Sequence, residues 1–481
     1  MSENTKFVFQ KDINLSLKSI NNFQQEKAFK IKKEGKNIDL ICLTEKKDNS
    51  DFFSCNFFFD NPIIGYDDLK KEIFNSEGSL TLLKLGETFS FHQKSIVKIN
   101  FTFNIPQIIN LTIKNFHSGF LSDYDNKFHR LIIPIEKDID FEIFTTKTLK
   151  IENETYFSGL VETIIDDYKY HIFKYKNENN KKIFFIIEGQ EKQSFINFKK
   201  SCHSITTSIG FLTGILLQNQ NFFQSSELIE FCKIENTYYE KKDNNIFNKN
   251  YITNPSHFID YLENIKQVEK YKEFSNPLSL DFFSNLCSKI KNNNVFSRSC
   301  QLIIESYSVK QKLTEAGILS IALETITNLV YEENKERMNP ISDKKLSQKI
   351  RAELKETLLN YNNVVTPEGM QILISKINEL NRPTNSKKLS YPFDYYKIKL
   401  NEKELEILNH RNKFLHGTSP FNEEELESKE QELLIIIAHL RFMVNSLLLK
   451  YVGYKGHIIH YPSVIEYNLK LSISNHLFRI I

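Results

Sequence analysis

The 481-residue sequence contains no tryptophan, few methionines (4) and six cysteines without any C-x-x-C pair. The cysteines are Cys42, Cys55, Cys202, Cys232, Cys287 and Cys300. Because no signal peptide is recognisable at Met1–Lys6 either, we expect free thiols in a reducing cytosol. A zinc site would need ligands gathered from remote segments, so we predict no metal and no cofactor.

Long hydrophobic runs and an excess of one charge are also missing. The most apolar run, Leu433–Ala438, is short and is followed by His439 and Arg441, which predicts a buried helix and no membrane span. The net charge is only +3, so a basic surface for nucleic acid would have to be local. The motifs G-x-x-x-x-G-K, H-E-x-x-H and G-x-S-x-G are absent, which argues against P-loop nucleotide binding, zinc proteolysis and serine-hydrolase chemistry.

The first half of the chain has the pattern of a β domain. Val97–Ile105 alternates apolar and polar residues, and Tyr170–Lys176 and Lys182–Glu188 flank a polar turn. Many short strands with polar turns predict a sandwich or a partly open barrel. From Gln193 to Leu217 the apolar period becomes helical, and we expect this helix to cover the sheet. Gly210 and Gly214 favour close packing against another backbone.

The second half is predicted to be helical. Expected helices include Ile318–Tyr331, Asp343–Leu359, a helix starting after Thr366, one from Glu402, and one from about Glu424 to Tyr451, with a loop over Asn381–Phe393. The predicted fold class is a multidomain α+β protein, in which a β-rich sandwich or barrel-like domain precedes an all-α helical bundle. The predicted parts are 1–225 (β-rich, sensor or regulatory), 226–295 (mixed connection), 296–455 (helical domain) and 456–481 (tail).

The helical domain contains the one motif in the chain that suggests chemistry. In Leu408–Gly417 an Arg-Asn pair is followed by His416 and then by Gly417, which is suited to end a helix. Arg411 and His416 are separated by four residues, and no other Arg–His pair in the chain has a gap of four to six. On a helix the two side chains are about 140° apart, so they would flank a surface.

This arrangement resembles the R-x(4–6)-H signature of HEPN domains, which in that family is the active site of metal-independent ribonucleases. Its place behind a different, β-rich domain resembles the ApeA-like HEPN proteins of bacterial anti-phage defence. The resemblance implies a cytoplasmic endoribonuclease that cleaves cellular RNA, such as tRNA, forms 2′,3′-cyclic phosphates and halts phage growth by abortive infection. It also implies a homodimer formed through the HEPN domain, an N-terminal domain that senses or restrains, and a phage-derived trigger.

Four residues are the predicted catalytic set. Imidazole suits proton transfer near neutral pH, so His416 is a candidate acid or base. The guanidinium of Arg411 is always charged, so it is suited to stabilise the negative charge of the phosphorane that forms during RNA cleavage. Asn412 lies four residues before His416 and could orient it, and Glu324 could orient Arg411 or His416. The plain alternative is a surface Arg and a helix-terminal His that favours the helix dipole.

Basic residues on two predicted helices, Asp343–Leu359 and the helix that ends at Tyr451, are the predicted RNA contacts. They are Lys344, Lys345, Lys349, Arg351 and Arg441. A solvated helix face is the competing interpretation, because Glu353 and Glu356 dilute the positive charge. Two functions of other classes also remain open. One is a non-catalytic HEPN module that binds nucleotide or protein, and the other is a ligand-binding β-sandwich whose helical domain serves only for dimerisation.

Overall fold

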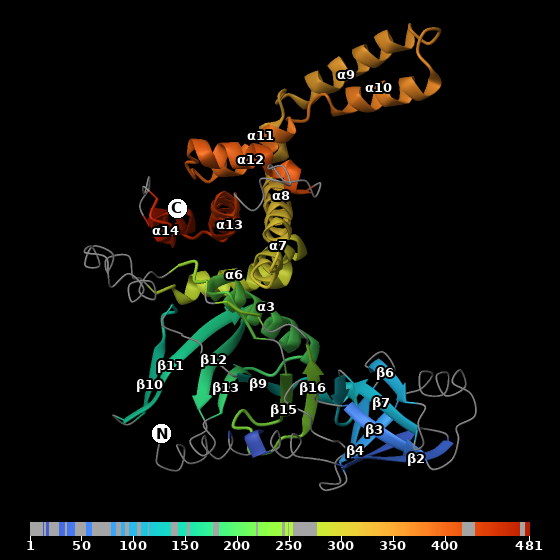
Figure 1. Cartoon of the computed structure of the whole chain (residues 1–481), viewed down its shortest axis with the longest axis vertical. Helices are drawn as coiled ribbons and strands as arrows, with labels where there is room; N and C mark the ends of the chain where they lie inside the picture. The colour runs from blue at the N-terminus through green and yellow to red at the C-terminus, as the bar shows by residue number, and fades with distance from the viewer. Residues whose placement is uncertain are drawn as a thin grey trace. The chain divides into compact units, whose positions relative to one another are not determined.

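The computed structural model describes residues 13, 16–18, 28–33, 36–43, 54–59, 78–82, 88–91, 96–102, 107–113, 115–135, 143–151, 154–176, 182–217, 220–242, 246–248, 250–253, 277–415, 429–471 and 477–481. The chain divides into two compact units, and each is described by itself (Figure 1). The first unit comprises Met1–Gly210, Ile215–Phe247 and Pro277–Lys291. The second comprises Phe211–Gly214, Asn248–Asn276 and Asn292–Ile481.

The first unit is built on antiparallel strands. They are β1 (Ala28–Lys33), β2 (Lys36–Leu43), β3 (Ser54–Phe59), β4 (Gly78–Leu82), β5 (Thr88–Phe91), β6 (Ile96–Thr102), β7 (Gln107–Ile113), β8 (Asn115–His117), β9 (Phe128–Ile135), β10 (Lys147–Ile151), β11 (Glu154–Ile165), β12 (Tyr168–Lys176), β13 (Ile183–Gly189), β15 (Gln220–Ser226) and β16 (Asn236–Lys241). They form a 15-stranded sheet in the order β10-β11-β12-β13-β9-β15-β16-β8-β5-β4-β1-β2-β3-β7-β6. The predicted pairing of β12 with β13 is confirmed, as is an antiparallel β region in the first half of the chain.

Helix α3 (Phe195–Thr213) packs against the strands β9, β12 and β15. The ring of Phe198 lies 5.2 Å from that of His129 and 6.2 Å from that of Phe223. The Tyr170 hydroxyl donates to Ser201 Oγ at 2.9 Å. The apolar stripe predicted for Gln193–Leu217 therefore does cover the sheet, although the helix ends at Thr213 and is followed by the short strand β14 (Ile215–Leu216).

Gly214 ends α3 because its backbone adopts φ +72°, and a Cβ at this position would lie 2.0 Å from the carbonyl oxygen of Asn248. We expect Gly214→Ala to destabilise the protein by about 2–5 kcal/mol, the sum of left-handed strain and a backbone clash. Gly453→Ala is the matched control, because Gly453 has φ +83° but open space around its Cβ. The control should lose only about 1–2 kcal/mol. Urea unfolding of both variants measures the difference, and equal losses would contradict the clash.

The second unit is largely helical. Its helices are α7 (Asn294–Ser306), α8 (Lys312–Met338), α9 (Lys344–Leu359), α10 (Pro367–Glu379), α11 (Asn385–Tyr395), α12 (Glu402–Leu415), α13 (Glu430–Tyr451) and α14 (Tyr461–Asn468). Helix α8 is central, because α7, α11, α12 and α13 all pack against it. The first unit contributes α6 (Leu280–Asn292) just before these helices in the chain. Helices α9 and α10 lie side by side (Figure 1).

By length and composition alone, α8 and α13 could each cross a membrane. In the structure, however, 78% of the apolar window of α13 and 50% of that of α8 are buried. The two helices also pack against each other. These are features of core helices in a helical unit, as predicted for Leu433–Ala438.

Two predictions in this half need correction. The predicted loop over Asn381–Phe393 contains α11, whose Thr384 hydroxyl caps the helix by accepting from Lys387 N. The helix forms although Pro392 lies inside it, because Leu389, Pro392 and Phe393 are buried. The segment predicted as a tail contains α14 and a two-stranded sheet of β18 (His457–Ile459) and β19 (Phe478–Ile480). It is therefore an integral part of the helical unit.

Candidate functional site

Arg411 lies in the last turns of α12 and is buried, with 5% of its surface exposed. Among the described residues, its Nε has no hydrogen-bond partner. Burial lowers the pKa of Arg411, and the charge of Glu324 on α8 acts in the opposite direction. The structure thus places Arg411 and Glu324, two residues of the predicted catalytic set that are 87 positions apart in the sequence, by the difference 411 − 324, on two helices that pack against each other.

Close packing of two helices places these residues. A Cβ added to Gly317 of α8 would lie 3.5 Å from the carbonyl oxygen of Phe414 in the last turn of α12. Glu324 lies seven positions after Gly317, and residues about two turns apart share one face of a helix. The face of α8 that meets the end of α12 is therefore also the face that carries Glu324. Glu324 itself is half-buried.

The remaining catalytic candidates follow at the end of α12. Asn412 is exposed to solvent. His416 and Gly417 lie outside the described residues, and α12 is described up to Leu415. The roles predicted for His416, and for Asn412 as its partner, remain predictions from the sequence.

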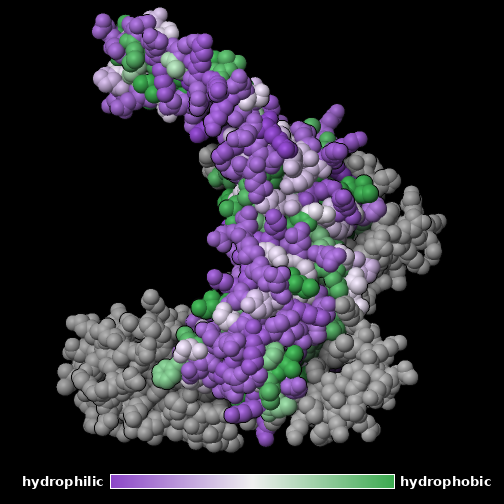
Figure 2. Space-filling view, turned by 180° about the vertical axis from the view of Figure 1, so that it is seen from behind, coloured by the Kyte–Doolittle hydropathy of each residue, from purple (hydrophilic) through white to green (hydrophobic). Residues whose placement is uncertain are grey.

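The basic candidates on α9 differ from one another. Lys344, Lys345 and Lys349 are exposed, and Lys349 is 3.9 Å from Glu353 in a surface ion pair. Arg351 instead donates from Nε to the Ser347 carbonyl and from Nη1 to the Asn378 carbonyl, both at 3.3 Å, which ties α9 to the end of α10. The surface of this helix pair, at the upper left of Figure 2, is mostly hydrophilic.

Arg441 of α13 is engaged inside the helical unit. Its Nη2 donates to Glu315 Oε1 of α8, and its guanidinium lies 4.6 Å from the centre of the Tyr307 ring. Lys312 also donates to Glu315, at 3.0 Å. Because the guanidinium of Arg441 is paired with Glu315 inside the helical unit, we do not include Arg441 among the RNA-contacting residues.

A second group of polar side chains lies at the start of α12. Glu404 is the third residue of the helix, and it forms a reciprocal cap with Asn401. Glu404 N donates to Asn401 Oδ1 and Asn401 N donates to Glu404 Oε2, each at 2.8 Å. The cap fixes the carboxylate at the buried end of the helix, where Glu404 has 0% of its surface exposed.

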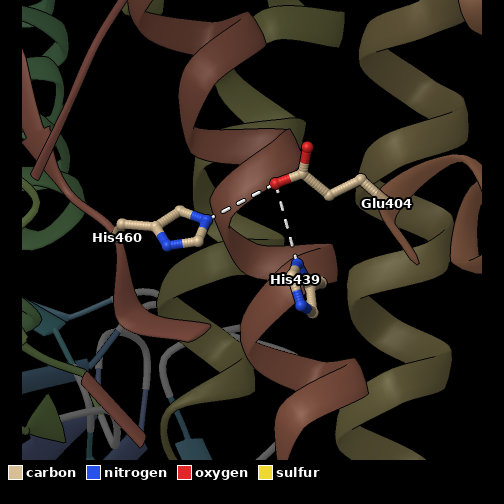
Figure 3. Close-up of side chains that lie close together, drawn as sticks. All are labelled: Glu404, His439 and His460. Carbon is tan, nitrogen blue, oxygen red and sulfur yellow. Dashed lines mark hydrogen bonds and ion pairs between the residues drawn. The ribbon is translucent and has the colours of Figure 1, made fainter. Parts of the chain in front are cut away.

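Three nitrogen groups surround the other oxygen, Glu404 Oε1. Two of them, the imidazoles of His439 and His460, are drawn in Figure 3. His460 Nε2, just after β18, is 3.4 Å away, and His439 Nδ1, in the middle of α13, is 3.7 Å away. Arg479 Nη1, on β19, is 2.5 Å away. Burial alone would raise the pKa of Glu404, but the contacts with His439, His460, Arg479 and the Asn401 N–H outweigh it and hold that pKa below its ordinary range.

The two histidines differ in their other contacts. His460 Nδ1 is 2.7 Å from Ser463 Oγ, and burial lowers the pKa of the imidazole. Both ring nitrogens of His439 lack a hydrogen-bond partner among the residues that the structure describes, although the side chain is only 2% exposed. The carboxylate oxygen and one nitrogen from each ring lie within 4.8 Å of one another, which is a set that could hold a metal ion.

Comparison of the chain with protein-family models, curated proteins and solved structures gave no match. Function must therefore be argued from residues and geometry. The metal-capable group was missed by the sequence analysis, which looked for closely spaced ligands. The only available signal was the pair Asn401 and Glu404, a helix-capping pattern that marks the carboxylate but not its histidine neighbours.

Proposed function

We propose that the chain is a metal-independent HEPN-type endoribonuclease, resembling the ApeA-like proteins, that cleaves cellular RNA in the cytoplasm during anti-phage defence. The observation that carries the proposal is the buried guanidinium of Arg411 in the last turns of α12, whose Nε has no hydrogen-bond partner among the described residues and whose charge interacts with that of Glu324. Burial within the helical unit restricts the guanidinium, and a guanidinium held in place can stabilise charge that develops on a phosphate. His416 follows Arg411 by five residues in the sequence, and this spacing predicts an imidazole close to the guanidinium.

The proposed reaction needs a base for the ribose 2′-OH, an acid for the leaving 5′-oxygen and a cation for the phosphorane. Arg411 supplies the cation. One His416 can serve as either base or acid, so we propose that two subunits meet through their HEPN domains and supply one imidazole each. Attack by the 2′-oxygen on phosphorus breaks the bond to the 5′-oxygen and leaves a 2′,3′-cyclic phosphate.

The other parts receive regulatory and binding roles in this proposal. Lys344, Lys345 and Lys349 are exposed on α9 and carry charge that could follow an RNA backbone. The β-rich unit, proposed to be a sandwich or barrel-like domain, would sense a phage-derived trigger or restrain the nuclease.

A second candidate function is a non-catalytic module that binds nucleotide or protein. The 5% exposure of Arg411 favours it, because a buried Arg beside a carboxylate also suits a purely structural ion pair.

RNA cleavage by the purified full-length protein tests the proposal. We expect cleavage without added Mg²⁺ and products whose 3′ ends are 2′,3′-cyclic phosphates, because the reaction uses the substrate's own 2′-oxygen as the nucleophile. Total cellular RNA and tRNA are the substrates, and sequencing of the ends is the measurement. The control is His416→Ala purified in the same way. Strict dependence on added Mg²⁺ would contradict the metal-independent mechanism, and identical products from the control would contradict the role of His416. Absence of cleavage by the wild-type protein would favour the binding module.

A further inference from the structure

The buried group of Glu404, His439 and His460 has the composition and spacing of a zinc site. In a tetrahedral site with bonds of about 2.0–2.1 Å, two ligand atoms are separated by about 3.3 Å. The separations from Glu404 Oε1 are 3.4 Å to His460 Nε2 and 3.7 Å to His439 Nδ1. All three atoms lie within 4.8 Å of one another. Small side-chain shifts would therefore bring them onto one ion.

His439 gives independent support for a missing ligand. A neutral imidazole has one N–H donor and one acceptor nitrogen, and leaving such groups unsatisfied in the interior costs about 1–3 kcal/mol. Within the described part of the chain, neither nitrogen of His439 has a partner at hydrogen-bond distance, Nδ1 being 3.7 Å from Glu404 Oε1, and the side chain is 2% exposed. A bound cation at Nδ1 would satisfy the nitrogen that faces Glu404.

The surroundings of the other two side chains are those that metal ligands need. Ligating histidines usually hold their second ring nitrogen in a hydrogen bond, and ligating carboxylates are hydrogen-bonded in turn. His460 Nδ1 is held by Ser463 Oγ at 2.7 Å, which leaves Nε2 for an ion. Glu404 Oε2 accepts from Asn401 N, and Oε1 accepts from Arg479. A carboxylate oxygen has two lone pairs, so Oε1 can accept from Arg479 and also bind a metal.

We propose that Glu404, His439 and His460 bind one Zn²⁺, which has a structural role. Two imidazole nitrogens and one carboxylate oxygen are ligands that zinc takes, and a water molecule would fill the fourth position of a tetrahedral site. Glu404 and His460 have 0% exposure and His439 has 2%, so a substrate has no route to the ion from solvent. The ion would join the start of α12, the middle of α13 and the segment after β18. It would therefore fix the helix that carries Arg411, about two turns further along. The proposal does not depend on the ribonuclease assignment.

Metal analysis of the full-length protein, purified without chelators or a histidine tag, tests the proposal. We expect about one zinc per chain by mass spectrometry, and less than about 0.1 in His439→Ala and Glu404→Gln. The control is His457→Ala, which changes a histidine three positions before His460 and should keep its zinc. Protein produced with Co²⁺ in place of zinc should show the visible absorption of tetrahedral cobalt.

Arg479→Met separates the zinc site from an ion pair without metal. If zinc neutralises Glu404, this variant keeps about one ion per chain and a melting temperature close to that of the wild type. If Arg479 alone neutralises the buried carboxylate, its loss leaves an unpaired charge and the melting temperature falls sharply. Wild-type protein that contains less than about 0.1 equivalent of zinc would overturn the proposal, whatever the variants do. Because the metal content is measured without RNA, an inactive nuclease does not affect this result.

Discussion

Replacing His416 by Ala should lower the rate of RNA cleavage by about 10²–10⁴-fold, the usual contribution of a general acid or base. Arg411→Lys should cost about 10²–10³-fold, because Lys keeps the charge beside Glu324 but cannot offer two parallel N–H donors to a phosphate. RNA binding should change little in either variant, since both groups act mainly on the transition state. The measurement is single-turnover cleavage of a labelled tRNA together with its equilibrium binding.

Stability has to be followed in the same variants. The sequence suggested that both side chains lie on an exposed helix turn, but Arg411 is buried. Arg411→Ala would remove the cation next to Glu324, and a loss of activity could then reflect unfolding. Arg411→Lys avoids this because it preserves the charge, so its melting temperature should stay close to that of the wild type.

A neighbouring histidine provides the matched control. His410 directly precedes Arg411 in the sequence but is outside the Arg–His signature. His410→Ala should keep nearly full activity. Full activity in His416→Ala would refute the assignment of His416. If His410→Ala is folded but inactive, His410 would be assigned as a catalytic histidine.

A mixed dimer with one wild-type subunit and one His416→Ala subunit should be nearly as inactive as the dimer of two variant subunits. If one His416 acts as base and the other as acid, the mixed dimer lacks one role completely, at a cost of about 10²–10⁴-fold. Two independent sites would instead retain about half of the wild-type activity, because one site stays intact. The two results differ far beyond the error of an activity assay.

Two different affinity tags, one on each subunit, isolate the mixed species by successive purification steps. The wild-type dimer with the same two tags is the control for any effect of the tags. A mixed dimer with half the wild-type activity would rule out the shared site and leave the ribonuclease assignment standing. A monomer at assay concentration that cleaves RNA at the full rate would rule out the dimer mechanism itself.

Local patterns predicted those parts of the fold that depend on local interactions. The bounds of α9, the start of α10 and the start of α12 follow from a capping residue and an apolar period, and the structure has them where the sequence indicated. Helix α11 was missed because Pro392 and the polar residues around it indicate a loop, whereas burial of Leu389 and Phe393 stabilises a helix. In α11, tertiary packing therefore outweighs the low helix propensity of the local sequence.

In the candidate sites too, the sequence predicted what depends on local spacing and missed what depends on tertiary packing. Arg411 and His416 are five residues apart, so their spacing is readable in the sequence. The proximity of Glu324 to Arg411 depends on how α8 packs against α12, and it could be guessed only from a lone carboxylate on an apolar stretch. Glu404, His439 and His460 are separated by 35 and 21 positions, by the differences 439 − 404 and 460 − 439. No spacing rule connects them, because three separate elements must first fold together.

The path of the chain between its two units limits what genetic dissection can show. Phe211–Gly214 belongs to the second unit, Ile215–Phe247 returns to the first, and Pro277–Lys291 returns to it again. A single cut anywhere between Phe211 and Lys291 therefore leaves each of the two fragments with residues of both units. Deletion mapping of the proposed phage resistance would therefore disrupt both units at once and could not assign the function to either one. Point substitutions and suppressor pairs, which keep the chain whole, are the genetic route to separating recognition from cleavage.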